Sequence, residues 1–521
     1  EILAQKIRKQ VHIRIIGDYD VDGVTSSHLF LTALRRVGAK VDVVIPHRIQ
    51  DGYGLSLHLL QQAKEDGVDT ILTCDNGIAA IDEIAWAKAQ KMTVLVTDHH
   101  AVPFEEHEGR RTEKKSLADA VVNPHQQDCG YPYKELCGAG VAWNVIRVLY
   151  ENYDMDKREA EDLLDFVAMA TVCDVMSLTG ENRILVKEGL KRIRHTKNIG
   201  LQALMQACNV QPENISAYHF GYVLGPCVNA TGRLDTARHA LRLFETGQET
   251  EAEEIARDLV DLNQERKELT LQGVEMAKKL CEEGGYENDP VLVLFLPDVH
   301  ESIAGLIAGR IREMYNRPVF VLTRGEEGVK GSGRSTENYS MYENMCGCVE
   351  LFTKFGGHPM AAGLSLPEEN VEKFRRKINE NCPLTVEEVC PDIHIDMAMP
   401  VGYASTELVH QFALLEPFGK DNPSPLFADR NLSISRMWLI GKNRNVLRMS
   451  VLSEYGQPVP VIFFGDVETL FAYFTEKFGQ EEVENALHGR KNRILFSMVY
   501  TAKIDFYQGN ENLQLEMKYY R

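Results

Sequence analysis

Short hydrophobic runs recur through the first 125 residues, and polar residues follow each of them. β-Branched side chains dominate the runs, and helix-like stretches separate them, a pattern typical of βαβ units that build a parallel sheet. The runs are VHIRIIG, VDVVIP, TILTCDNG, TVLVTDHH and DAVVNP. The first part of the chain is therefore predicted to be an α/β domain with a parallel sheet.

The pattern changes three times after this domain. Residues 138–200 look helical, and a long, highly charged stretch follows that is typical of a solvated connecting helix. A second, smaller α/β unit opens at DPVLVLFLP and continues through RPVFVLT and the glycine-rich FGGHPMAAG. After LLEPFGKDNPSPLF the chain turns to the short strands NLSISRMWLIG, VLRMSVLS and VPVIFFG, which predict a small β-barrel.

With 521 residues the chain is too long for one core. The changes of pattern predict five segments. They are an α/β domain at 1–233, a connecting helix at 234–284, a second α/β domain at 285–390, a linker at 391–427 and a barrel at 428–521.

Aspartate and histidine residues stand at the ends of the predicted strands. In open α/β sheets, ligands bind where the carboxyl ends of the strands gather. One further aspartate lies deep in an apolar helical stretch, where a lone charge is costly unless it is paired or binds a metal ion. The candidates are Asp18, Asp20, Asp22, Asp75, Asp98, His99, His100 and Asp174.

The stretch GDYDVDG has the alternating aspartates that open a calcium-binding helix-loop-helix. Counted from Asp18, the twelfth position should hold a bidentate Glu, but Leu29 stands there. The β-branched run before Asp18 also favours a strand over an entering helix. The calcium loop is therefore rejected.

Mixed carboxylate and imidazole ligands suit Mn²⁺ or Mg²⁺ better than a structural zinc, which favours cysteine sulfur. Two such ions that share a bridging aspartate hold an attacking hydroxide and stabilise the leaving oxygen. The pattern thus predicts hydrolysis of a phosphoester or phosphoanhydride. Any one of these aspartates, taken alone, is better explained as a helix cap or a turn residue, but the whole set at successive strand ends is not.

The formal charge of −19 argues against a generic polyanion binder, because phosphate contacts depend on Lys and Arg. No apolar run is long enough to cross a bilayer, and the first residues lack the core of a signal peptide, so a soluble cytoplasmic protein is expected. The eleven cysteines show no disulfide framework and are expected to be reduced.

The motifs DYDVDG, CDNG, TDHH and the aspartate of ATVCDVMSLTGENR resemble those of the DHH phosphoesterase superfamily. More narrowly, PHRIQDGYGL, CGAGVAW, GPCVNATGRL, RSTENYSM, FGGHPMAAG and LEPFGKDNPSPLF resemble the RecJ family of single-strand-specific 5′-to-3′ DNA exonucleases. The resemblance covers nearly the whole chain. It implies a DHH catalytic domain, a DHHA1 domain that contributes to substrate binding, and a C-terminal oligonucleotide-binding (OB) fold that binds single strands.

The resemblance also implies roles for single residues. The implied metal ligands are Asp20 with Asp18 beside it on one ion, Asp22, His99 and Asp174 on the other, and Asp75 between them. His100 would lie near the scissile phosphate, where it steadies the transition state or protonates the leaving oxygen. The implied catalytic residues are these ligands without Asp18, together with His100. Asp98 would orient a histidine.

Substrate contacts are implied at Arg48, Tyr53, Arg233, Arg334, Ser335, Gly357 and His358. An arginine fork can grip a phosphate with two hydrogen bonds, although a surface or ion-paired arginine is the alternative. The basic run HGRKNR at 488–493 either contacts the nucleic-acid backbone or is a solvated loop. One departure from the family pattern is the pair Glu301 and Ser302 after His300, which leaves substrate contacts there open.

The resulting hypothesis is a two-metal exonuclease that degrades single-stranded DNA to mononucleotides in recombination and repair. The implied partners are a single-strand-binding protein and a DNA helicase, and the chain is expected to be a monomer without membrane contact. Two alternatives stay open. One is another enzyme of the superfamily that cuts short oligonucleotides, cyclic dinucleotides or pyrophosphate, and the other is a catalytically silent scaffold that binds single strands.

Overall fold

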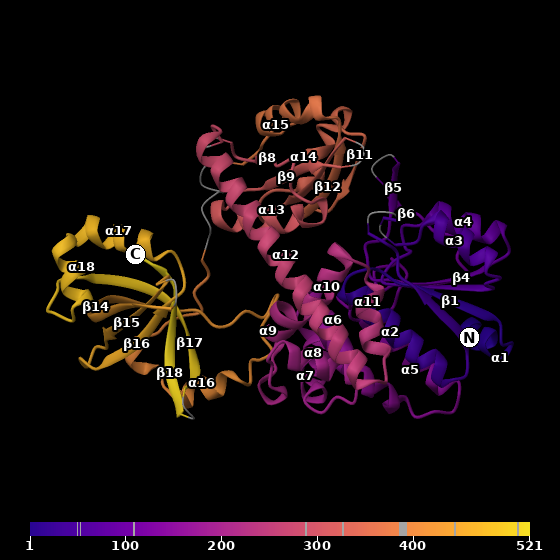
Figure 1. Ribbon diagram of the computed structural model, residues 1–521, viewed down its shortest axis with the longest axis horizontal. Coiled ribbons are helices and arrows are strands. Elements are labelled where there is room, and N and C mark those ends of the chain that lie inside the picture. Colours follow the sequence, from indigo (N-terminus) through magenta and orange to yellow (C-terminus); the bar gives the residue numbers. More distant parts are fainter. Residues whose placement is uncertain are drawn as a thin grey trace. The chain divides into compact units, whose positions relative to one another are not determined.

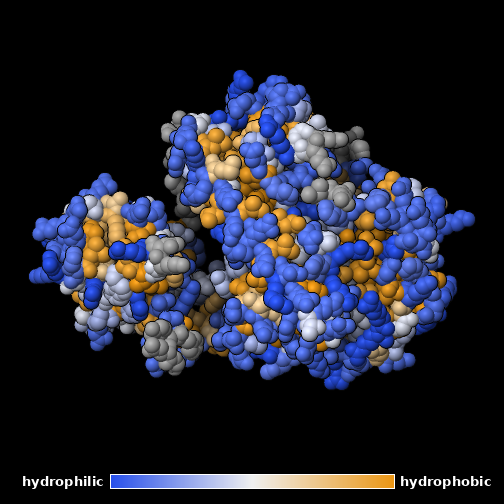
Figure 2. Space-filling view, in the orientation of Figure 1, coloured by the Kyte–Doolittle hydropathy of each residue, from blue (hydrophilic) through white to orange (hydrophobic). Residues whose placement is uncertain are grey.

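The structure is a computed structural model that describes residues 1–48, 51–52, 54–107, 110–286, 289–325, 328–384, 393–441, 444–507 and 510–521. The chain forms two compact units, Glu1–Pro391 and Asp392–Arg521. Each is described by itself (Figure 1). Hydrophilic side chains cover most of the visible face of both (Figure 2), as the high content of charged residues requires.

A parallel sheet with the order β2-β1-β3-β4-β7 forms the core of the first domain. Its strands are β1 (His12–Ile16), β2 (Lys40–Val44), β3 (Thr70–Cys74), β4 (Thr93–Thr97) and β7 (Ala120–Val122). The inner strands are buried because helices cover the sheet, which explains their apolar, β-branched sequences. The predicted parallel sheet is confirmed. A hairpin of β5 (Phe104–His107) and β6 (Arg110–Glu113) was not predicted, because its sequence is charged and lacks apolar alternation.

Helices pack around this sheet and continue beyond it as a helical layer (Figure 1). The α-helices are α1 (Ile2–Arg8), α2 (Val21–Arg36), α3 (Leu57–Glu65), α4 (Ile81–Ala89), α5 (Gly138–Glu151), α6 (Leu164–Cys173), α7 (Gly180–Ile193), α8 (Ile199–Ala207), α9 (Ala217–His219), α10 (Gly225–Leu234) and α11 (Arg238–Glu245). The shorter turns are η1 (Lys157–Leu163), η2 (Pro212–Asn214) and the π-helix η3 (Phe220–Leu224). One continuous core joins α2, α5, α6 and their neighbours.

A helix of 35 residues, α12 (Glu249–Glu283), leads from this layer to the second sheet. Its first half packs on α8 and α10, while Val274, Ala277 and Cys281 in its second half belong to the core of the next domain. The stretch predicted as a solvated connecting helix therefore also buries an apolar stripe. Thr246 ends α11 before α12 begins, so the stretch contains two helices.

The second sheet is mixed and has the order β11-β12-β10-β9-β8. Its strands are β8 (Leu292–Phe295), β9 (Val319–Arg324), β10 (Val329–Arg334), β11 (Lys354–Gly357) and β12 (Ala361–Leu366). Around it lie η4 (Glu301–Ile303), α13 (Ala304–Tyr315), α14 (Met341–Cys346), η5 (Val349–Leu351), η6 (Glu368–Asn370) and α15 (Val371–Glu380). Only β8 and β9 run parallel, because antiparallel hairpins connect the later strands.

The second unit is a closed five-stranded barrel, since β14 pairs with both β15 and β17. Its elements are β13 (Met397–Ala398), η7 (Val401–Tyr403), α16 (Thr406–Phe412), β14 (Phe427–Ile440), β15 (Val446–Leu452), β16 (Pro458–Phe463), α17 (Val467–Phe478), α18 (Gln480–Leu487), β17 (Leu495–Tyr507) and β18 (Asn510–Tyr520). The predicted β-barrel is confirmed. Among the described residues, no helix is long and apolar enough to cross a membrane.

Candidate metal centre and phosphate site

The carboxyl ends of three neighbouring strands bring the predicted acidic residues together. Asp18 follows β1, Asp75 follows β3, and Asp98 and His99 follow β4. Because β1, β3 and β4 are adjacent and parallel, their ends meet at one edge of the sheet. The remaining candidates come from α2 and from the end of α6, where Asp174 is the C-cap.

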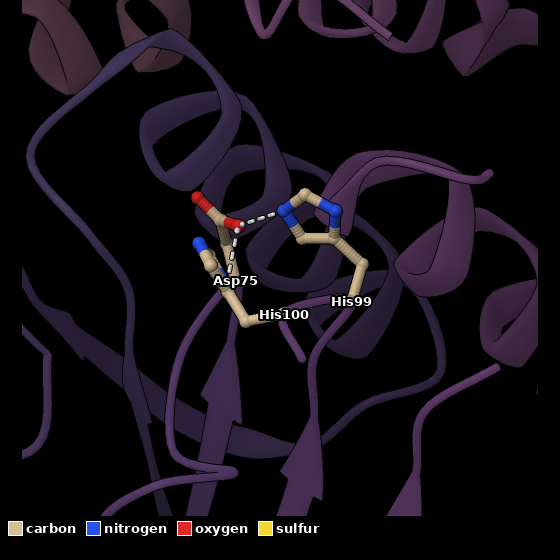
Figure 3. A group of neighbouring side chains, drawn as sticks. All are labelled: Asp75, His99 and His100. Carbon is tan, nitrogen blue, oxygen red and sulfur yellow. Dashed lines mark ion pairs between the residues drawn. The ribbon is translucent and has the colours of Figure 1, made fainter. Parts of the chain in front are cut away.

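His99 lies at the centre of this cluster. Its Nε2 is 3.0 Å from Asp75 Oδ1 (Figure 3) and 3.6 Å from both Asp22 Oδ2 and Asp174 Oδ2. Burial lowers the pKa of His99 and favours the neutral imidazole, which is the form that binds a metal ion.

The side chains form three overlapping groups whose potential ligand atoms lie within 4.8 Å of one another. The groups are Asp18–Asp20–Asp75, Asp22–His99–Asp174 and Asp75–His99–His100. Asp75 belongs to two of them. A carboxylate that two ions share would belong to two such groups.

The electrostatics of the cluster fit a bound cation. Burial, together with the negative charges of neighbouring aspartates, raises the pKa of Asp18, Asp20 and Asp75. Asp18 Oδ1 and His99 Nε2 are buried and make no hydrogen bond. Divalent cations would satisfy these atoms and offset the repulsion. The oxygen-rich donor set with imidazole suits Mn²⁺ or Mg²⁺.

Asp22 is held by the start of a second helix. The backbone N–H groups of Gly138 and Ala139 donate to its two carboxylate oxygens at 2.6 and 2.7 Å. The N-terminus of α5 therefore lies against this carboxylate and stabilises its charge. Only glycine fits at position 138, because a Cβ there would lie 2.6 Å from Asp75 Cβ. Gly138 and Ala139 belong to the motif CGAGVAW. Their contact with Asp22 could not be predicted from the motif, because backbone atoms make it.

Two residues of the centre have left-handed backbone conformations that are unusual for non-glycine residues. Asp75 has φ 60°, and Val175, directly after Asp174, has φ 54°. For a β-branched valine this conformation is strained. Strain of this kind persists where the surrounding structure over-determines the backbone, as at functional sites.

Asp98 belongs to none of the three groups and contacts His100 instead. Its Oδ1 is 2.8 Å from His100 Nδ1, and its oxygens also accept the backbone N–H groups of Ile78, His99 and His100. Burial by itself would lower the pKa of His100, but the Asp98 hydrogen bond and the surrounding carboxylates raise it to about 9. The Asp98 carboxylate therefore favours the protonated form of His100, which can act as a proton donor.

Three arginines form a second charged cluster beside the first. The Arg48 guanidinium lies 4.7 Å from the ring centre of Tyr19, the residue between Asp18 and Asp20. Burial and the neighbouring arginines lower the pKa of Arg334 and lower that of Arg233 to about 9. Within the described residues none of the three pairs with a carboxylate. Guanidinium groups without a carboxylate partner can bind a phosphate through charge-assisted hydrogen bonds.

Helix α10 connects the two clusters. Asn229 Oδ1 accepts the N–H of Val21 at 3.1 Å, and Arg233 Nη1 donates to the Ser302 carbonyl of the second domain at 2.6 Å. A Cβ on Gly232 would lie 2.4 Å from the Tyr19 carbonyl oxygen. The helix therefore requires glycine here to approach the loop that carries Asp18 and Asp20. Asn229 and Gly232 stand in the quoted motif GPCVNATGRL, but the sequence alone assigned them no role.

The other predicted contacts are more scattered. Ser335 is buried, and its hydroxyl donates to the Tyr339 carbonyl at 2.5 Å. Gly357 and His358 are exposed at the end of β11. His300 caps η4 through Ser302. Tyr53 lies outside the described residues.

Family models match three parts of the chain. They are the DHH family, N-terminal domain, at residues 12–171, the DHHA1 domain at 288–382, and the RecJ OB domain at 395–519. The single-stranded-DNA-specific exonuclease RecJ of Haemophilus influenzae is 33% identical over 539 residues, which covers 99% of this chain and 89% of that protein. The chain belongs to the RecJ family. Its assignment to the nuclease class of hydrolases follows from this membership.

RecJ of Bacillus subtilis is also 33% identical, over 459 residues that cover 87% of this chain. The match spans only 56% of that relative's length. Among solved structures, RecJ of Thermus thermophilus in complex with Mn²⁺ has a TM-score of 0.80 at 26% identity and covers all of this chain and 70% of its own. The complex of the same RecJ with Mg²⁺ gives a TM-score of 0.73. The expected cofactors, Mn²⁺ or Mg²⁺, are thereby confirmed for the RecJ fold.

A substitution at Asp75 tests the shared ligand. Asp75→Asn keeps the shape, suits φ 60° and removes one negative charge, so the metal-free protein should unfold at the same or a higher temperature. Wild-type protein at Mn²⁺ of about 100 Kd should gain about 2.7 kcal/mol, and the variant should gain less than half of that. Calorimetric unfolding in EDTA and in Mn²⁺ measures both effects.

The matched control is Asp82→Asn, an exposed aspartate in the first turn of α4. It should keep the full Mn²⁺ response. An Asp75→Asn protein with an undiminished response would contradict the role of Asp75.

Proposed function

We propose that this chain is a metal-dependent exonuclease that degrades single-stranded DNA from 5′ to 3′ into mononucleotides, in DNA recombination and repair. The observation that carries this proposal is that two clusters of opposite charge lie side by side. One consists of buried carboxylates and the other of arginines. A single-strand-binding protein and a helicase are the partners that the family resemblance implies, and the chain would act as a monomer.

The residues that would hold two ions are divided by their geometry. Asp18 and Asp20 form one group with Asp75, and Asp22, His99 and Asp174 form another. Asp75 Oδ1 lies 3.0 Å from His99 Nε2 and would be shared between the two ions. When bound, Mn²⁺ or Mg²⁺ would polarise the scissile phosphate and supply an activated water. Asp20 also caps α2 through the N–H of Gly23, so one of its oxygens holds the loop while the other remains for a ligand.

The side chains around the centre would bind and orient the strand. Arg48, Arg233 and Arg334 would hold the phosphate of the terminal nucleotide, which sets the neighbouring phosphodiester against the carboxylate cluster. His100, protonated and aligned by Asp98, would donate its proton to the departing 3′ oxygen. One mononucleotide would leave, and the shortened strand would keep a 5′-phosphate.

The barrel carries a face suited to a single strand. Trp438 on β14 lies directly opposite Arg448 on β15, and the guanidinium groups of Arg436 and Arg448 are each 5.8 Å from its ring centre. The HGRKNR turn lies beside this face, because a Cβ on Gly489 would be 3.5 Å from Arg436 Cδ. Aromatic rings flanked by cations stack bases without sequence preference. This face supports a substrate longer than a dinucleotide.

The residues of the basic run HGRKNR, expected to contact the nucleic-acid backbone, differ in their surroundings. Arg490 and Lys491 are exposed, whereas Arg493 pairs with Glu482 at 2.7 Å. Arg490 and Lys491 thus remain proposed contacts, and Arg493 supports the turn.

A catalytically silent scaffold is disfavoured, because every implied ligand position holds a carboxylate or imidazole.

The decisive assay uses a single-stranded DNA with a 5′-phosphate and a 3′ fluorescent label. In Mn²⁺, wild-type protein should release unlabelled mononucleotides first while the labelled strand shortens, and a duplex should resist. Release of the labelled 3′ nucleotide first would contradict the proposed direction. Hydrolysis of a cyclic dinucleotide with an intact single strand would favour the alternative enzyme of the superfamily.

The pairing of Asp98 with His100 predicts the pH dependence of cleavage. A group that must be protonated loses its function as the pH rises through its pKa, so kcat/KM should fall above about pH 9. Asp98→Asn should move this alkaline limb down by about one to two pH units, because a hydrogen bond to a charged group contributes roughly 1.5–3 kcal/mol and one pKa unit is about 1.4 kcal/mol. The pH profile of kcat/KM measures the shift.

Asp128→Asn, at an exposed aspartate that pairs with Lys115, is the control and should leave the profile unchanged. If the alkaline limb of Asp98→Asn coincided with that of wild type, His100 would not be the proton donor.

The barrel face is tested by Trp438→Ala. Loss of a stacked base costs about 1–3 kcal/mol, so the affinity for a long single strand should fall roughly 5- to 150-fold. Tyr519→Ala removes an exposed aromatic residue of β18 that has no stacked cation in the described part of the barrel, and it should bind normally. Fluorescence anisotropy with labelled DNA measures both affinities. Equal losses in the two variants would show that Trp438 has no special role.

A further inference from the structure

A cavity of about 450 Å³ lies against the second sheet, and Arg48 of the arginine cluster lines part of it. Tyr19 and Arg48 of the first domain line one side, and residues of β10, β11 and β12 form the other. A water molecule occupies about 30 Å³ of liquid, and a phosphate group is only a few times larger. The cavity therefore has room for considerably more than the one phosphate of a strand end.

The strand register arranges the floor of this cavity in rows. Lys330 on β10 lies opposite Ser365 on β12, which in turn lies opposite Lys354 on β11. Residues two apart on a strand share a face and are about 6.7 Å apart. The next row on the same face is Ser332, Gly363 and Gly356, and Arg334 follows Ser332 at the same spacing.

The row of Ser332, Gly363 and Gly356, which lies between the lysines and Arg334, leaves free space above its two glycines. A Cβ on Gly356 would meet nothing within 4 Å, and one on Gly363 would come no closer than 3.9 Å to the Gly331 carbonyl oxygen. A ligand can thus lie directly on the backbone between Arg334 at one end and the two lysines at the other. Arg334 and the lysines stand two rows apart, about 13 Å along the strands, and their long side chains reach toward the middle row, where a chain of linked phosphates would lie.

The charges of the outer row are only partly compensated. Lys330 pairs with Glu301 at 2.8 Å, whereas Lys354 has no ion-pair partner among the described residues and is exposed. Glu301 is the acidic residue that departs from the expected pattern after His300. One lysine in excess, together with Arg48, leaves the cavity positive, which selects for an additional anion.

We propose that this cavity is a subsite for the β- and γ-phosphates of a strand whose 5′ end is a triphosphate. The inference rests on the proposed function, in which Arg48, Arg233 and Arg334 hold the first phosphate of the end. Strands that a polymerase begins de novo from a nucleoside triphosphate have such an end. The substrate class is thereby widened from 5′-monophosphorylated strands to polyphosphorylated ones.

The chemistry of the step is an ordinary hydrolysis. Water adds to the phosphorus of the first internal phosphodiester, and the bond to the 3′ oxygen of the terminal nucleotide breaks. The terminal nucleotide leaves as an intact nucleoside triphosphate with its 3′ hydroxyl restored, and the shortened strand keeps a 5′-phosphate. No pyrophosphate is released in this step.

The test compares three single strands of one sequence that carry a 5′-hydroxyl, a 5′-monophosphate or a 5′-triphosphate. For wild-type protein we expect the triphosphate strand to bind and be cleaved within about threefold of the monophosphate strand, with a nucleoside triphosphate as its first product in mass spectra. A variant with both Lys330→Met and Lys354→Met should lose about tenfold in affinity and kcat/KM for the triphosphate end alone. The monophosphate end should change by less than twofold.

Two further variants sharpen the comparison. Glu301→Gln removes the acid beside Lys330 and should favour the triphosphate end by a few fold. Lys373→Met, on α15 beside Asn370, removes a lysine that does not line the cavity and should not distinguish the ends. Anisotropy in EDTA measures end-dependent binding without cleavage, and thermal unfolding confirms that each variant is folded.

The outcomes separate this inference from the proposed function. Failure to degrade the monophosphate strand in Mn²⁺ would refute the proposed function, while the binding comparison would still decide on the subsite. Exclusion of the triphosphate strand, release of pyrophosphate, or equal losses for both ends in the double lysine variant would overturn the subsite. Lysine-dependent binding of free inorganic triphosphate without binding of the triphosphate strand would also overturn it.

Discussion

The repulsion among carboxylates that are gathered at one sheet edge is the constraint on which the rest of the site depends. Asp18, Asp22 and Asp75 are all buried, and the His99 imidazole lies 3.6 Å from Asp22 and 3.0 Å from Asp75. Buried negative charge that a neutral imidazole does not offset is costly. The fold reduces this cost with helix N-termini, since Asp20 caps α2 and the start of α5 donates two hydrogen bonds to Asp22. These contacts hold the carboxylates in place without neutralising them, so the demand for cations remains.

The arginine cluster beside these carboxylates gathers positive charge in the same way. Aspartates and arginines this close would be expected to pair, which would satisfy both clusters and destroy both sites. Instead, backbone carbonyl oxygens accept hydrogen bonds from the guanidinium groups. Arg233 donates to the Ser302 carbonyl, and Arg334 donates to the Gly333 carbonyl at 2.7 Å. Arg48 is held by the face of the Tyr19 ring. The two clusters therefore keep their charges separate, one requiring cations and the other an anion. A phosphodiester with its metal ions supplies both.

The fold and the position of the acidic cluster could be predicted from the sequence because both follow from one regularity. Apolar runs that end in polar residues predict parallel strands, and parallel strands place their ends together, so Asp75 and His99 could be expected to meet although they are far apart in the chain. The contacts of Gly138 and Gly232 could not be predicted, since they depend on a missing Cβ and on backbone groups. The charged β5–β6 hairpin was missed for the related reason that nothing apolar marks it.

The distribution of charge also bears on why such an enzyme would act at ends. A chain with a net charge of −19 repels a polyanion over most of its surface. Positive potential is concentrated in the cavity beside the metal centre and on the Trp438 face of the barrel. Residues of two domains line this cavity, Tyr19 and Arg48 from the first and the strands of the second sheet from the other. Attraction that is confined to such a place selects for a free end, whereas a broadly basic surface would hold nucleic acid at any point along its length.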